Sequence, residues 1–140
     1  MDYNIVPIAD GDDKFIKDKL VEYNLSMVPA TQSELFEPVS KKIVDEEGNI
    51  IAGCLAIMHC WNVVAIDILW VDDQYRGQRL GSILLDEVEC EATEKGCHLV
   101  HLDTYDFQAK GFYEKNGYSV FGTLEDCPKG HIRYYLKKSL

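Results

Sequence analysis

One stretch of the chain constrains the fold more than any other. Residues 63–71 (VVAIDILWV) form an apolar run of strand length, and a glycine-containing turn follows it. Beyond the turn, apolar side chains recur at three- and four-residue steps, which predicts an amphipathic helix; they are Leu80, Ile83, Leu84, Val88 and Ala92. A further apolar run follows at residues 98–104. Because a strand that follows such a helical crossover returns in the same direction, this stretch predicts one parallel strand pair.

The residues before this unit predict antiparallel strands. Residues 41–58 alternate as a hairpin with its turn at residues 46–49, and a second short turn near Trp61-Asn62 leads into residues 63–71. Strands joined by such short connections pair in antiparallel fashion. The predicted fold is therefore α/β, with a mixed, mostly antiparallel sheet that contains one parallel pair and is flanked by helices.

The remaining segments complete this prediction. Residues 3–8 alternate as a first strand, and a helix follows with Asp10, Asp12 or Asp13 as its cap. We expect residues 26–38 to be irregular. A short helix at residues 109–115 ends at Asn116-Gly117, and two last strands are expected at residues 118–122 and 131–136. No repeat or linker divides the sequence, so a single domain spanning residues 1–140 is predicted.

Composition excludes several classes of function. The net charge of −10 disfavours nucleic acid and anionic membranes as partners. No apolar run approaches the roughly 18 residues that span a bilayer, and the acidic N-terminus is unlike a secretory signal. The five cysteines are odd in number and scattered, which predicts reduced thiols in the cytoplasm. No pair of cysteines has metal-ligand spacing, so no metal is expected.

The turn after residue 71 has the features of an anion site. Residues 74–82 contain Arg76 and Arg79, no acidic residue, and two glycines that let a ligand approach the backbone. A helix N-terminus offers unpaired N–H groups and the positive end of the helix dipole to a phosphate. The stretch matches neither the Walker A loop nor the dinucleotide fingerprint. The alternative is an ordinary turn whose glycines serve geometry alone.

Two motifs resemble those of the GNAT N-acetyltransferase superfamily. Arg76-Gly77-Gln78-Arg79-Leu80-Gly81, before a helix, resembles its acetyl-CoA-binding motif, and Phe112 to Tyr118 (FYEKNGY) resembles its FYxKxGF/Y signature. The resemblance implies an acetyl-CoA-dependent enzyme of this fold. It departs at Arg79, where the family usually has a glycine. The cofactor-binding residues that it implies are the backbone groups of Leu69 and Val71, then Arg76, Gly77, Gln78, Arg79, Leu80, Gly81 and Ser82, and finally Asp106 and Gln108.

Asp67 is the predicted general base. Strand alternation places it on one face with Ala65, Leu69 and Val71, the face that the resemblance implies lines the cofactor gap. An apolar setting there would raise its pKa and make it a better base. The alternative is a structural aspartate paired with a buried Lys, Tyr or His. His131, Glu125 and Tyr105 are lesser candidates for the base.

Tyr113 is the predicted general acid. It occupies the position of the tyrosine that protonates the leaving thiolate in the resembled family, although a Phe-Tyr pair on a short helix is also a common core element. Lys110 and Lys115 either meet the 3′-phosphate of the cofactor or are solvated.

The sequence therefore predicts an N-acetyltransferase that works by direct transfer in a ternary complex. The alternative function is a non-catalytic acyl-CoA-binding or sensing module. The expected acceptor is a small-molecule or peptide amine, selected by residues 24–38 and 123–132. The protein is expected to be cytoplasmic, without nucleic acid or membrane partners, and a homodimer is the candidate assembly.

Overall fold

The structure is a computed structural model that describes residues 2–140. It consists of two compact units, the first ending at Thr31 and the second running from Gln32 to Leu140. The first unit holds helix α1 (Asp12–Met27), which confirms the predicted helix. Its N-cap residue is Gly11 in the left-handed conformation, and no side chain caps the helix, so the predicted aspartate cap is wrong. The predicted strand at residues 3–8 is also wrong, because an extended segment is a strand only when a neighbouring strand pairs with it, and these residues belong to none of the seven strands.

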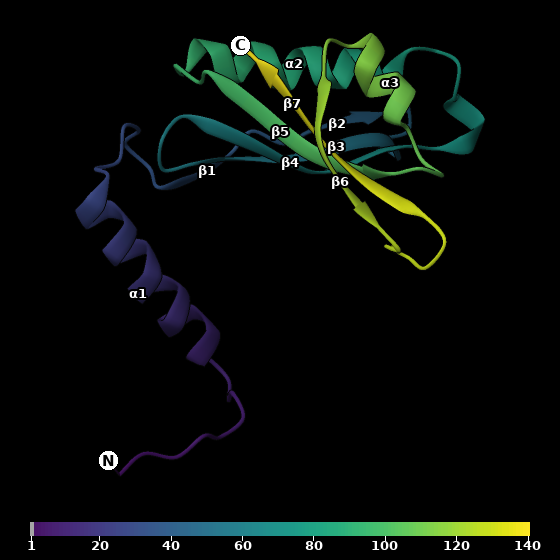
Figure 1. Cartoon of the computed structure of the whole chain (residues 1–140). Helices are drawn as coiled ribbons and strands as arrows, with labels where there is room; N and C mark the ends of the chain where they lie inside the picture. Colours follow the sequence, from purple (N-terminus) through teal and green to yellow (C-terminus); the bar gives the residue numbers. More distant parts are fainter. Residues whose placement is uncertain (1) are drawn as a thin grey trace. The chain divides into compact units, whose positions relative to one another are not determined.

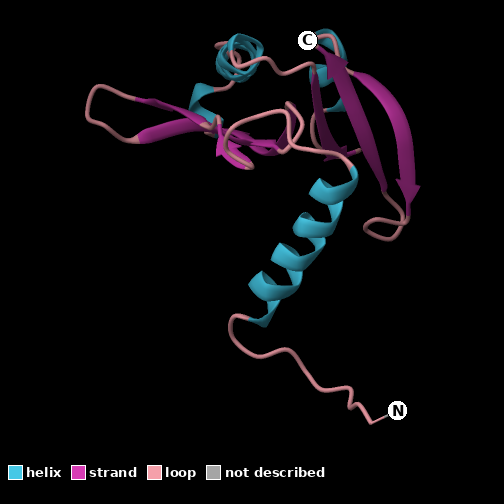
Figure 2. Ribbon diagram, turned by 90° about the vertical axis from the view of Figure 1, so that its left-hand side faces the viewer, coloured by secondary structure: helices cyan, strands magenta, loops and turns pink. Residues whose placement is uncertain are grey.

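The second unit is a mixed sheet with helices along one face (Figure 1). Its strands are β1 (Phe36–Pro38), β2 (Lys41–Val44), β3 (Ile50–His59), β4 (Val63–Val71), β5 (Leu99–Tyr105), β6 (Ser119–Glu125) and β7 (Ile132–Ser139). A short 3-10 helix, η1 (Asp73–Tyr75), precedes α2 (Leu80–Glu94), and α3 (Lys110–Lys115) follows β5. Figure 2 shows the structure turned by 90°, with helices in cyan and strands in magenta.

The strand order is β1-β3-β4-β5-β7-β6, and β2 also pairs with β3. Only β4 and β5 run parallel, as the strand–helix–strand stretch predicts, and every other pairing is antiparallel. The predicted fold class is thus confirmed. Strand β1 lies in the segment that was expected to be irregular; it is only three residues long and contains Pro38, so it lacks a sequence pattern.

The core lies between α2 and the sheet. Leu84, Leu85, Val88 and Ala92 of α2 are buried in one cluster with residues of β3, β4, β5 and β7. The predicted helical face is right at Leu84, Val88 and Ala92, but Ile83 is exposed, and Leu85, which the pattern left out, is buried. From the strands, alternate residues such as Met58 and Val64 complete the same cluster. Truncating one of the buried leucines to alanine costs about 2–5 kcal/mol in comparable cores, so this face fixes α2 on the sheet.

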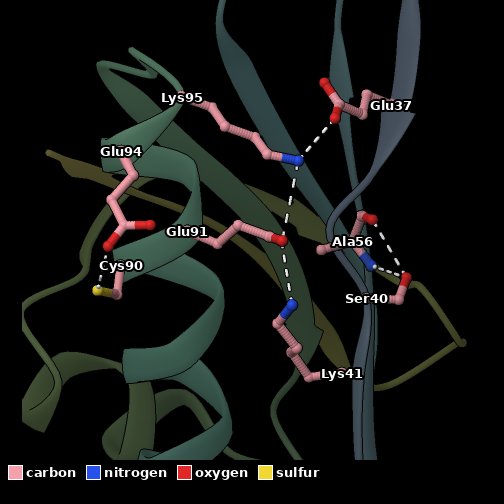
Figure 3. A network of polar contacts seen from close by, with 8 residues as sticks. All are labelled: Glu37, Ser40, Lys41, Ala56, Cys90, Glu91, Glu94 and Lys95. Carbon is pink, nitrogen blue, oxygen red and sulfur yellow. Dashed lines mark hydrogen bonds and ion pairs between the residues drawn. The ribbon is translucent and has the colours of Figure 1, made fainter.

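Polar contacts hold the C-terminal half of α2. Lys95 Nζ lies 2.6 Å from Glu37 Oε1 of β1, and Lys41 Nζ of β2 lies 3.2 Å from Glu91 Oε2 of the helix (Figure 3). Ser40 both accepts a hydrogen bond from the Ala56 N–H and donates one to its carbonyl, so it joins β3 where β1 ends and β2 has not begun. Partly exposed ion pairs of this kind contribute about 0–1 kcal/mol each.

A buried carboxylate anchors the middle of α2. Glu89 accepts hydrogen bonds from the Tyr118 hydroxyl (2.9 Å) and from Lys138 Nζ of β7 (2.6 Å), and Lys138 also donates to the Asn116 carbonyl. Burial and the Glu89 carboxylate raise the pKa of Tyr118, so its hydroxyl remains a donor. Removing one partner of such a buried pair typically costs 3–5 kcal/mol. The N-terminus of α2 is therefore held in a defined place relative to β4.

Candidate active site

Strands β4 and β5 pair over three residues and then diverge. Val63, Val64 and Ala65 pair with residues 99–101, and beyond them the two strands share no hydrogen bonds. Strand β5 instead continues along β7 as far as Tyr105. The second half of β4 therefore has a neighbour on its β3 side alone, and a gap opens on its other side.

The open side of β4 presents backbone polar groups. The Asp72 N–H donates to the Ile51 carbonyl (2.9 Å), so Asp72 points its backbone groups toward β3. Because these groups alternate along an antiparallel strand, Leu69 and Val71 direct theirs the other way, into the gap beside β5. These are the two residues whose backbone was predicted to meet a cofactor.

A β-bulge falls at Asp67. Leu55 of β3 pairs with Ile68, and the next residue of β3, Ala56, pairs with Ile66, so Asp67 has no partner. The extra residue turns the strand over, and Leu69 and Val71 then pack on the core face that Ile66 occupies. The predicted shared face of Ala65, Asp67, Leu69 and Val71 is therefore wrong, since simple alternation does not continue through a bulge.

The surroundings of Asp67 also differ from the prediction. Its side chain is exposed rather than enclosed by apolar groups. Within residues 2–140 it makes no hydrogen bond and no ion pair, so the structure does not contain the paired aspartate that was the alternative.

The turn between β4 and α2 combines two left-handed residues with an uncapped helix. Gly77 has φ 82° and Arg79, the N-cap of α2, has φ 63°. Among residues 2–140 no side chain caps this helix, and its first turn has no acidic residue, so the N–H groups of Leu80, Gly81 and Ser82 are available to an anion. The conformation of Arg79 explains why a glycine is usual there, since a left-handed residue other than glycine costs about 1–2 kcal/mol.

A cavity of about 670 Å³, here called the turn pocket, lies at this turn. Of the predicted cofactor-binding residues, its lining includes Leu69, Val71, Arg76, Gly77, Arg79, Leu80, Gly81, Ser82 and Gln108. Gln78 and Asp106 are not part of it. The rest of the wall is formed by Trp70, Tyr75, Phe107, Ala109, Phe112 and Tyr113. The aromatic residues among them come from three separate segments, so only the FYxKxGF/Y motif gave a sequence signal for any of them.

Gly81 packs closely against α3. A Cβ atom at this position would lie 3.0 Å from the Phe112 ring, which is closer than such atoms normally approach. The first turn of α2 thus touches α3 directly, and the two motifs singled out in the sequence meet at this contact.

Arg76, which lines the turn pocket, forms an ion pair with Asp73. Its Nη2 lies 3.0 Å from Asp73 Oδ1, and both side chains are largely exposed. The turn contains two arginines, but the charge of one of them, Arg76, is balanced by Asp73, which lies just before the turn.

A second cavity of about 370 Å³, the strand pocket, fills the gap between β4 and β5. Its walls are Ile66, Asp67, Ile68 and Leu69 from β4, Leu102, Asp103, Thr104 and Tyr105 from β5, and Gln108, Ala109, Tyr113 and Arg133. Asp103, Thr104 and Arg133 were missed by sequence reasoning. They come together because Tyr105 pairs with Arg133 and Asp103 with Tyr135 across β5 and β7, a register that the sequence does not reveal.

The two cavities meet at a shared wall. Leu69, Gln108, Ala109 and Tyr113 line both of them. A molecule held in the turn pocket can therefore present one end to a second molecule in the strand pocket.

Tyr113 stands at this junction and is almost fully buried, with 6% of its surface exposed. Burial, with smaller contributions from Cys54 and Asp103, raises the pKa of Tyr113 to about 12. Its hydroxyl is thus protonated throughout the neutral range and can donate a proton or a hydrogen bond there.

Gln108 has a fixed amide orientation. Its Oε1 accepts hydrogen bonds from the Tyr105 N–H (2.9 Å) and from the Thr104 hydroxyl (3.1 Å), and Thr104 is buried. Because a backbone N–H can only donate, the oxygen must face Tyr105, which turns the NH₂ group of Gln108 away from it. Within residues 2–140 that group has no partner, so it can donate to a carbonyl oxygen at the junction.

Asp106 is committed elsewhere. One carboxylate oxygen lies 2.9 Å from His131 Nδ1 and the other accepts from the Ile132 N–H (2.9 Å). Desolvation acts to raise the pKa of Asp106, but the hydrogen bonds from His131 and Ile132 outweigh it and lower the pKa overall. Asp106 therefore ties the β6–β7 hairpin to the end of β5. Of these two predicted cofactor-binding residues, Asp106 and Gln108, the geometry favours Gln108.

The other candidates lie apart from the junction. His131 and Glu125 line neither cavity, whereas Tyr105 lines the strand pocket. Lys110 pairs with Glu114 one turn along α3 (3.3 Å).

All five cysteines are free thiols. Among residues 2–140, no cluster of three or more His, Cys, Asp or Glu side chains could hold a metal ion, and no helix is long and apolar enough to cross a bilayer.

Comparison with known proteins decides the family. Residues 40–120 match the family model described as the acetyltransferase (GNAT) domain. The chain belongs to the GNAT acetyltransferase family. Its curated relatives include blasticidin-S acetyltransferase of Streptomyces morookaense, with 33% identity over 83% of this chain and 85% of that protein.

Solved GNAT structures share the fold. An acetyltransferase from Bacillus cereus ATCC 14579 superimposes with a TM-score of 0.90 at 39% identity, over 99% of this chain and 98% of that one. A protein from Bacillus anthracis, crystallised with acetyl coenzyme A, has a TM-score of 0.66 at 20% identity, over 74% of this chain and 63% of its own. The GNAT resemblance and the acetyltransferase class predicted from the two motifs are thereby confirmed.

Proposed function

We propose that this GNAT protein transfers an acetyl group from acetyl-CoA to a primary amine by direct attack in a ternary complex. The observation that carries the proposal is the shared wall of the two cavities, which brings a donor in the turn pocket and an acceptor in the strand pocket to one point. Acetyl-CoA supplies the activated acetyl group and leaves as its thiol.

The turn pocket suits this donor. The uncapped N-terminus of α2 and the left-handed residues Gly77 and Arg79 offer backbone N–H groups to a diphosphate. The open backbone groups of Leu69 and Val71 can pair with the amide-containing arm as a neighbouring strand would. A backbone N–H directed at the thioester oxygen stabilises the charge that develops there, an effect worth about 3–4 kcal/mol for one donor.

Asp67 would take the proton of the amine. An alkylammonium group, with a reference pKa of about 10.4, is protonated at pH 7 and cannot attack. Asp67 lies on the wall of the strand pocket with its carboxylate unpaired. It can accept the proton directly or through a water molecule.

Tyr113 would donate a hydrogen bond to the departing sulfur. Its pKa of about 12 lies well above the reference value of about 8.5 for a thiol. Complete proton transfer from the tyrosine to the thiolate is therefore uphill. The tyrosine stabilises the thiolate by a hydrogen bond. The ammonium proton goes to Asp67, and the second proton, which the nitrogen loses after its attack, goes to the sulfur, so that CoA leaves as its thiol.

Two measurements test the proposal. Calorimetry with acetyl-CoA measures binding at the turn pocket, and a thiol-release assay with a panel of amines measures transfer. Binding with amine-dependent thiol release supports the proposal. Binding without release by any amine favours the acyl-CoA-binding module instead.

The acceptor proposed here is a small molecule. The volume of the strand pocket is near the lower end for small-molecule sites, about 300–1,000 Å³, and the named relative acts on blasticidin S. The cytoplasmic location, the exclusion of nucleic acid and membranes, the single domain and the possible homodimer remain predictions.

A further inference from the structure

Three charged side chains line the strand pocket, and they are not equivalent. They are Asp67 from β4, Asp103 from β5 and Arg133 from β7. Two carboxylates and one guanidinium leave the cavity with a net charge of −1. The remaining wall residues are uncharged, and several are apolar.

Arg133 is already matched. Its Nε donates to Asp103 Oδ1 (3.0 Å) and its Nη2 lies 2.9 Å from Asp103 Oδ2, a two-point pair. The hydrogen bond with Asp103 raises the pKa of Arg133. The guanidinium carbon also lies 5.7 Å from the centre of the Tyr105 ring and 5.4 Å from that of Tyr135. An incoming carboxylate would have to compete with Asp103 for a group held on several sides.

Asp67 keeps the unmatched charge. Within the described part of the chain nothing pairs with it, and it stands on a bulge that projects from the regular ladder. An acceptor in the strand pocket therefore faces one free carboxylate and no free cation among the residues that line the cavity.

We infer that the acceptor is a small cationic amine with no carboxylate on the carbon that bears the reacting nitrogen, and so not an α-amino acid. This inference rests on the proposed function and narrows its substrate class. The ammonium group is attracted by Asp67, while Ile68, Leu69 and Leu102, with the Tyr105 ring, receive the alkyl or aryl part. A carboxylate beside the amine would lie within a few ångströms of Asp67, and like charges at this range near a protein surface weaken binding tenfold or more.

Matched pairs of compounds test the inference. Tyramine and tyrosine, histamine and histidine, and tryptamine and tryptophan differ within each pair by one carboxylate. Their binding to the CoA-saturated protein is measured by calorimetry at low ionic strength, and kcat/KM is measured with acetyl-CoA. We expect the decarboxylated member of the preferred pair to bind at least tenfold more tightly and to have at least a tenfold higher kcat/KM. Equal values, a preference for the amino acid, or no binding by any of the six compounds would overturn the inference.

A charge variant separates this explanation from a structural one. Arg133→Gln leaves Asp67 and Asp103 together and should widen the preference for the decarboxylated amine, with folding checked by thermal denaturation. If Arg133 instead binds an acceptor carboxylate, the wild type prefers the amino acid and the variant loses that preference. Asp67→Asn, measured by binding alone because this residue is the proposed base, should narrow the preference to less than threefold.

The binding arm requires no turnover, so the two proposals can fail separately. Decarboxylated amines that bind preferentially but are never acetylated would support the substrate class and contradict the proposed transfer. Acetylation of the amino acids in preference to their decarboxylated amines would support the proposed transfer and contradict the substrate class.

Discussion

The turn pocket and the strand pocket are built in different ways. Most of the turn pocket comes from one continuous stretch, residues 69–82, and its chemistry lies in backbone groups and left-handed residues. The strand pocket takes its charged groups from β4, β5 and β7, which lie far apart in the sequence. The first is therefore encoded locally, whereas the second exists only once the sheet has its register. Substitutions at the two should separate donor binding from acceptor chemistry.

The largest expected effect is in the strand pocket. Asp67→Asn should lower kcat by roughly 10²–10⁴, the range for loss of a general base, and leave the Kd of acetyl-CoA within twofold. Steady-state kinetics and calorimetry measure the two quantities. Asp86→Asn, on the exposed face of α2, is the matched control and should change neither. A kcat within threefold of wild type would remove Asp67 from the mechanism.

Tyr113 lies where the pockets meet and tests their coupling. Tyr113→Phe should lower kcat about 10- to 100-fold, as expected for one hydrogen bond to a charged group. Since the pKa of Tyr113 is about 12, its hydroxyl is protonated below that pH, and wild type and variant should have parallel kcat–pH profiles between pH 6 and 10. An alkaline loss of activity present only in the wild type would show that Tyr113 ionises in this range.

Tyr118→Phe is the matched control for that substitution. Tyr118 lines neither cavity but donates to buried Glu89, so its loss should reduce the free energy of unfolding by about 1–3 kcal/mol while kcat is retained. Thermal denaturation records the first effect.

A smaller effect is expected where Thr104 orients Gln108. Thr104→Val keeps the shape of the side chain but removes the donor to Gln108 Oε1, and we expect KM for acetyl-CoA to rise about 2- to 12-fold. Thr104→Ser restores a hydroxyl and should recover most of the affinity. If both variants behave alike, the hydroxyl does not act through Gln108.

The smallest effect is expected in the turn. Arg79→Gly should relieve the left-handed strain and raise the free energy of unfolding by about 1 kcal/mol, a shift of about 3–4 °C in Tm. Gln78→Gly is the matched control, because Gln78 is not among the positive-φ residues and should lose stability. Calorimetry with CoA on Arg79→Gly then reports the contribution of the arginine side chain to binding. An unchanged or lower Tm for Arg79→Gly would mean that contacts of the arginine outweigh its strain.

Much of the fold could be predicted from local sequence patterns. The sequence predicts β4 with its observed bounds because eight apolar residues and Asp67 stand between two turns, and it predicts α2 because the helical spacing continues for three turns. The segment at residues 3–8 has the same alternation as a strand, but alternation alone cannot supply the neighbour that a strand needs.

The site was predicted only as far as its chemistry is local. The turn and both motifs pointed to most of the turn pocket, while the bulge at Asp67 overturned the predicted face because nothing in the residue types marks it. Asp103 and Arg133 could have been found only by aligning β5 with β7, since one residue of slip would move either side chain to the other face.

Because Asp67 is the extra residue of the bulge in β4, replacing it and deleting it have different consequences. An exchange at this position alters one side chain and leaves every pairing of β3 and β4 in place. A deletion would give an unbroken ladder with the same partners, because Ile68 would still pair with Leu55 and Leu69 with Cys54, so the last four residues of the strand would keep their faces. The faces of β4 therefore do not depend on residue 67, whose presence serves to add one more side chain beside the gap.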